Sequence, residues 1–135
     1  MTIRHFMGPA VRTRVAIGVL VGLAAQQLAA APAVAAARPA AGRYAAELCV
    51  TTIPAPPNCG LAQVDLRRGG AVRVRVDDLV YHLKLHRSRI ELMLMHGAVE
   101  VDDFIAPYQW AGRLLQFIDT DRGVLYEVRF GDRTR

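Results

Sequence analysis

From residue 42 onward, apolar and polar residues alternate along the chain with a period of two. In residues 72–76 three valines alternate with two arginines, and residues 79–85 place apolar side chains at every odd position. Such alternation is typical of β-strands that bury one face. The same pattern continues, with interruptions, over residues 43–50, 60–67, 90–95, 99–105, 114–118 and 124–130.

Short polar or glycine-containing turns separate these runs, so there is no room for crossover helices, and neighbouring strands are expected to be antiparallel. We predict one all-β domain over residues 42–130, a small antiparallel meander of about eight strands closed like a barrel. A two-sheet sandwich is the alternative. The proline-rich segment 51–58 is predicted as a loop, and Pro107 is predicted to break a strand.

Residues 1–37 follow a different pattern. Three arginines precede an apolar run at 15–25, and alanine-rich positions follow up to Ala37. This is the plan of a helical signal peptide, with cleavage expected near residues 35–37. The apolar run has about eleven residues, whereas a membrane-spanning helix needs roughly 20. We therefore expect a periplasmic or secreted protein with no stable membrane insertion after cleavage.

Cleavage changes what the composition implies. The whole chain has 17 basic and 12 acidic residues, a formal net charge of +5. Three arginines belong to the predicted leader, so the remaining 98 residues have a net charge of +2. A basic chain suggests a nucleic-acid partner only when its charges gather on the folded domain, so no nucleic acid is expected. Residues 38–41 are predicted as a linker, and residues 131–135 as a flexible tail.

Two cysteines, Cys49 and Cys59, remain after the leader. An even number of cysteines in an oxidising compartment indicates a disulfide. Nine intervening residues match no redox or zinc motif, which makes a reactive or metal-binding pair the weaker interpretation. Both cysteines lie at outward-pointing positions of consecutive predicted strands, so a bridge between those strands is geometrically reasonable.

The sequence offers few groups for catalysis. Ser88 is the only serine and falls in a predicted turn without a nucleophile motif. His82 and His86 lie four residues apart on a predicted strand, about 13 Å, which is too far for both to bind one zinc ion. The acidic pairs fall at turns, where aspartate bonds the local backbone. We therefore predict no catalytic residue, no cofactor and a chain that is not an enzyme.

Met93, Met95 and His96 raise the possibility of a soft-metal site, because thioether and imidazole suit Cu(I). Met93 and Met95 share a face of their predicted strand, but His96 points to the other one. Packing is the favoured interpretation, so no metal is predicted. Tyr108 and Trp110 are interpreted as core residues in preference to a platform for stacking a ligand.

Several apolar residues occupy positions whose parity points outward. They are Val80, Met93, Met95, Leu114, Ile118 and Leu125. An exposed apolar cluster often marks a contact with another protein, so these residues form a candidate binding face or homodimer interface. The alternative is that they belong to central strands of a sandwich, buried on both faces.

These observations favour an exported, non-catalytic β domain that binds a protein in the cell envelope, as an inhibitor, an immunity-type protein or a structural partner. A protein partner or a homodimer is expected. A small barrel that carries an apolar ligand is the alternative, since eight-stranded barrels can enclose one small molecule. A small hydrolase that uses carboxylates or histidine is the third and weakest hypothesis.

Overall fold

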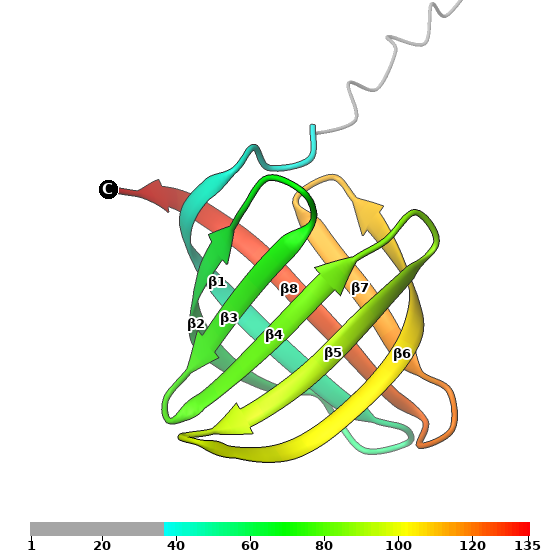
Figure 1. Cartoon of the computed structure of the whole chain (residues 1–135). Coiled ribbons are helices and arrows are strands. Elements are labelled where there is room, and N and C mark those ends of the chain that lie inside the picture. The colour runs from blue at the N-terminus through cyan, green and yellow to red at the C-terminus, as the bar shows by residue number, and fades with distance from the viewer. Residues whose placement is uncertain (1–36) are drawn as a thin grey trace, which may run out of the picture. The chain divides into compact units, whose positions relative to one another are not determined.

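The computed structural model describes residues 37–135, so the predicted signal peptide lies, apart from Ala37, outside the described residues (Figure 1). Eight antiparallel strands form a closed barrel in chain order, and β8 pairs with β1 to complete it. The strands are β1 (Gly42–Thr52), β2 (Asn58–Leu66), β3 (Ala71–Val76), β4 (Leu79–Leu85), β5 (Arg89–His96), β6 (Val99–Ala111), β7 (Leu114–Asp119) and β8 (Val124–Thr134). The predicted barrel is confirmed, and the sandwich alternative is wrong.

One hydrophobic core fills the inside of the barrel. Val72 and Val74 are buried, while Arg73 and Arg75, which alternate with them, are exposed, as the alternation predicts. Buried residues of every strand join the same core cluster. Because a single sheet closes on itself, each strand has one dry face and one face toward solvent.

Aromatic rings pack against one another inside the barrel. The rings of Phe117 and Tyr126 stack with centroids 4.9 Å apart, and Phe104 lies 5.5 Å from Tyr126. Tyr108 and Trp110 are half-buried and pack against the core, in agreement with their interpretation as core residues. Within residues 37–135 there is no helix long and apolar enough to cross a membrane.

A disulfide joins Cys49 and Cys59, as the sequence predicts. The two residues lie directly opposite each other in the β1–β2 pairing. Cys49 is 4% exposed and lies between Cys59 of β2 and Glu127 of β8. The bridge therefore links two strands that already pair from Gly42 to Val50 of β1.

Pro107 does not break its strand, contrary to the sequence prediction, because β6 continues through it from Val99 to Ala111. The pairing of β6 with β5 ends at Pro107, and its pairing with β7 begins at Tyr108. A proline cannot donate a hydrogen bond to a neighbouring strand. Pro107 is tolerated because it lies where β6 passes from one partner strand to the other.

The N-terminal part of β6 has no ladder to β7, and Arg122 spans the gap instead. Its guanidinium bonds Asp102 of β6 and lies 3.7 Å from the Asp119 carboxylate at the end of β7. Asp119 is buried and accepts hydrogen bonds from the backbone N–H of Asp121 and Arg122. This turn role of Asp119 agrees with the sequence interpretation.

The segment predicted as a linker, residues 38–41, packs against the barrel. Pro39 is buried, and the Tyr44 hydroxyl donates to the carbonyl oxygen of Ala40. The Tyr44 ring in turn packs edge-on against Phe130 at 5.4 Å. The segment is held because an inward-facing tyrosine near that end of the barrel needs a hydrogen-bond acceptor.

The C-terminus also differs from its prediction. Residues 131–134 belong to β8, where the sequence predicts a flexible tail. Thr134 pairs with Arg43 at the start of β1, and the Arg133 guanidinium donates to the Ala41 carbonyl oxygen at 3.0 Å. The polar composition of this stretch reflects exposure and not disorder, because backbone pairing with β1 holds it.

Candidate functional site

The six residues of the predicted binding face lie outside the closed barrel, in two separate places. Val80, Met93 and Met95 lie on β4 and β5, where Val80 is directly opposite Met95. Leu114, Ile118 and Leu125 lie on β7 and β8, where Ile118 is directly opposite Leu125. Strand β6 separates the two groups. The interpretation that these strands are buried on both faces is wrong, because a barrel has only one interior.

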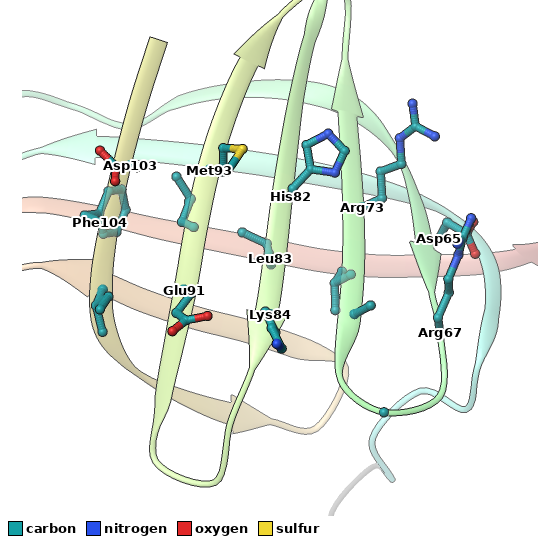
Figure 2. A pocket seen from close by; sticks show the side chains of 15 residues that line it. Asp65, Arg67, Arg73, His82, Leu83, Lys84, Glu91, Met93, Asp103 and Phe104 are labelled. Atoms are coloured by element: carbon teal, nitrogen blue, oxygen red, sulfur yellow. The ribbon is translucent and has the colours of Figure 1, made fainter. Parts of the chain in front are cut away.

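Met93 is the most exposed of the six, at 43%, whereas the other five are half-buried. A hollow of 640 Å³ crosses the outer surface of β2–β6 at this position. Figure 2 shows Arg73, His82, Met93 and Asp103 in line across four neighbouring strands that border it. The group on β4 and β5 is therefore the stronger candidate for a binding site.

We name the outward residues of β3–β6 around this hollow the Met93 face. Its residues are Ala71, Arg73, Arg75, Val80, His82, Lys84, Glu91, Met93, Met95, Glu100, Asp103 and Ile105. They form three rows across four strands, because the register places each residue opposite its neighbours. Strands are about 4.8 Å apart and outward residues about 6.8 Å apart along a strand, so the rows span about 14 Å in both directions.

Charge is divided sharply across the Met93 face. The basic residues Arg73, Arg75 and Lys84 lie on β3 and β4, whereas the acidic residues Glu91, Asp103 and Glu100 lie on β5 and β6. Within residues 37–135, only Glu91 of these six takes part in an ion pair, with His86 at 3.1 Å. The face thus presents five charges to solvent with no partner on the barrel.

The contact between Glu91 and His86 has an electrostatic consequence. The close contact with the His86 ring lowers the pKa of the Glu91 carboxyl below its ordinary value, and the positive charges of Lys84 and Arg89 add to this effect. Glu91 therefore stays ionised at neutral pH, and the acidic half of the face keeps its charge.

Part of the exposed apolar surface was not predicted from the sequence. Ile105 is 63% exposed, and Val99 and Val101 at the start of β6 are also exposed. For Ile105 the signal is present in the sequence, because Phe104 and Ala106 must point inward and Ile105 between them must then point outward. A β-bulge beside Met95 shifts the register of the first residues of β6, and no alternation pattern reveals that shift.

The residues considered for catalysis or metal binding are dispersed. Ser88 is exposed in the turn after β4, His82 is exposed opposite Met93, and His96 ends β5. In the described part of the chain, the one group with metal-ligand spacing is Glu47 with Cys49 and Cys59. Both of its sulfur atoms are already bonded to each other, so neither is a thiolate ligand.

One end of the barrel interior is polar and contains the most perturbed titratable group. Burial raises the pKa of Tyr126 to about 12, and the charges of Asp102 and Asp119 contribute. Burial also raises the pKa of Tyr81, whose ring centroid lies 6.3 Å from that of Tyr126. Both hydroxyl groups therefore hold their protons at neutral pH.

No protein-family profile, curated protein or solved structure matches this chain.

Proposed function

We propose that this chain is an exported, non-catalytic β-barrel domain that binds a protein through the Met93 face. It acts in the periplasm or outside the cell as an inhibitor, an immunity-type protein or a structural partner. The observation that carries the proposal is the exposed apolar centre at Met93, bordered by unpaired charges of opposite sign on its two sides. Protein interfaces combine an apolar centre with a polar rim in this way.

The compartment is proposed from the leader pattern and from the disulfide. A bridge between Cys49 and Cys59 persists in oxidising spaces and is rare in the cytosol. The barrel around it is small, and small exported domains commonly depend on such bridges. These features support a location outside the cytoplasm.

The packing of the interior favours a surface role over the transport of an apolar ligand. The stacked rings of Phe117 and Tyr126 and the adjoining Phe104 occupy the volume that a ligand would need. The Met93 face carries charges of both signs, a chemistry that suits a protein partner better than a lipid or another apolar molecule.

The proposal is tested by capture from envelope extracts with three forms of the processed chain. They are the wild type, the double variant Met93→Glu with Met95→Glu, and the control Leu61→Glu. Leu61 lies on β2 outside the Met93 face and is 86% exposed, so the control adds one negative charge at an accessible apolar position. We expect one partner to be retained by the wild type and the control and lost by the double variant.

All the substituted side chains in this test point away from the core, so the three forms should unfold at similar temperatures. Equal retention of the same partner by all three forms would mean that the Met93 face is not the binding surface. A partner that is a second copy of this chain is recognised by giving the bait a tag that the chain in the extract lacks.

A further inference from the structure

The charges of the Met93 face are arranged so that the face is complementary to itself. The line between β4 and β5 divides it into a basic and an acidic half, and each basic residue has an acidic counterpart in the same row. The three counterpart pairs are Arg73 with Asp103, Arg75 with Glu100 and Lys84 with Glu91. Each pair is equidistant in strand order from the dividing line.

We infer that the protein bound by this face is a second copy of the same chain, related by a two-fold axis parallel to β4 and β5. This inference rests on the proposed function and names its partner. Rotation about such an axis places β4 of one copy over β5 of the other, and β3 over β6. A two-fold interface uses the same surface on both subunits, which this arrangement of charge satisfies.

The apolar residues obey the same symmetry. Under this rotation Val80 faces the Met95 of the second copy, and Ala71 faces its Ile105. Met93 faces His82 in the middle row, so its exposed thioether becomes covered by an imidazole ring. The apolar centre is thus buried, and the six opposed charge pairs, counted over both copies, surround it.

The other simple axis in the plane of the face gives a poor match. A two-fold axis perpendicular to the strands, through the middle row, would set Arg73 against its own symmetry mate and Asp103 against its own. Like charges in contact across an interface cost several kcal/mol. The charge pattern therefore selects the axis parallel to the strands.

The size of the face sets the strength of the dimer. Its rows span about 14 Å in each direction, a smaller area than the roughly 800 Å² per partner of a standard interface. We expect a dissociation constant on the order of 10 µM. Because the exposed charges are screened by salt, the dimer should weaken as ionic strength rises.

Sedimentation equilibrium of the processed chain tests the inference, with the charge-reversal variants Arg73→Asp and Asp103→Arg. Each variant alone places like charges opposite each other at two symmetry-related positions, so self-association should weaken at least tenfold. An equimolar mixture of the two variants restores opposite charges at both positions. The mixture should therefore form a mixed dimer, and a chain with both substitutions should self-associate like the wild type.

The matched control is Arg43→Asp, which reverses a charge on β1 outside the Met93 face and should leave the dimer unchanged. A wild type that stays monomeric well above the expected constant would overturn the inference, as would a dimer that both single variants retain. Failure here leaves the proposed function standing if the capture experiment still yields a different protein through Met93 and Met95. Recovery of such a protein by monomeric wild type would identify the occupant as a foreign partner and overturn the dimer.

Discussion

Removal of the disulfide should weaken the barrel by a calculable amount without unfolding it. The perturbation is the double variant Cys49→Ala with Cys59→Ala. The bridge closes a loop with a sequence separation of ten residues, and the chain-entropy model then gives about 9 cal/mol/K, or about 2.7 kcal/mol at 25 °C. A domain of this size has a total free energy of unfolding of about 5–15 kcal/mol, so the variant should remain folded.

Local packing adds little to this figure. Cys49 is buried and loses only a sulfur atom in the variant, while Cys59 is exposed. The nine opposed residue pairs between β1 and β2 remain, as does the pairing of β1 with β8. The main effect is therefore on the unfolded chain, which gains the freedom that the bridge removes.

Urea unfolding of three samples measures the effect: the oxidised wild type, the reduced wild type and the double variant. The last two should lose the same free energy of unfolding, about 2 to 3 kcal/mol, and melt roughly 10–20 °C lower. If the variant loses much more than the reduced protein, the packing of Cys49 and not loop closure holds the strands together. A loss below about 1 kcal/mol in both samples would refute the entropic argument.

Three further predictions concern the barrel itself. The substitution Leu115→Ala empties a fully buried position and should lower the free energy of unfolding, measured in urea, by about 2–5 kcal/mol. The substitution Leu114→Ala on the outer surface should lower it by no more than about 1 kcal/mol. Similar losses for the two variants would contradict the assignment of Leu115 to the interior and Leu114 to the surface. Because the pKa of Tyr126 is raised to about 12, its proton is retained by the fold, and the free energy of unfolding should fall as pH rises from 10 to 12. The substitution Tyr126→Phe should make the free energy of unfolding fall less over this pH range. If an absorbance titration of the folded protein shows all tyrosine hydroxyls ionised near pH 10, the raised pKa of Tyr126 is contradicted. Arg122→Gln removes the contacts to Asp102 and Asp119 and should speed amide exchange at the start of β6 while lowering global stability by less than about 1 kcal/mol; unchanged exchange there would show that the gap is closed by other contacts.

Alternation was sufficient to predict the strands, because each strand of a closed barrel has one buried face. Val72 and Val74 illustrate this, since their neighbours are arginines and leave no doubt about parity. The disulfide followed from the same parity together with the predicted compartment. Short turns between the strands gave the antiparallel order, and the closed ring is what eight such strands form without an exposed edge.

The departures from prediction come from contacts between distant parts of the chain. Pro107 is allowed in β6 only because two different strands pair on either side of it. The pairing of Thr134 with Arg43 joins the two ends of the domain, so no local pattern indicates that the tail is a strand. The composition of each segment does not report these long-range partners.

The candidate site was only partly predictable for a similar reason. Parity identified Met93 as an outward apolar residue, but not its neighbours across the strands. The register of β3–β6 places Arg73 and Asp103 in its row, and that register depends on turn lengths and on the bulge in β6. The six residues of the predicted binding face form two separate groups on the barrel. Alternation indicates which face of a strand a residue lies on, but not where that strand lies around the barrel.

Photo-crosslinking in living cells of the native host tests whether the chain binds its partner through the Met93 face. A photoreactive residue replaces one outward side chain at a time in the full chain with its leader, at Met93, Met95 and Asp103 and, as controls, at Leu61, Ile118 and Leu125. We expect one crosslinked product at the first three positions, of twice the mass of the processed chain if the partner is a second copy. Crosslinks confined to the controls, or none at any position, would contradict this expectation.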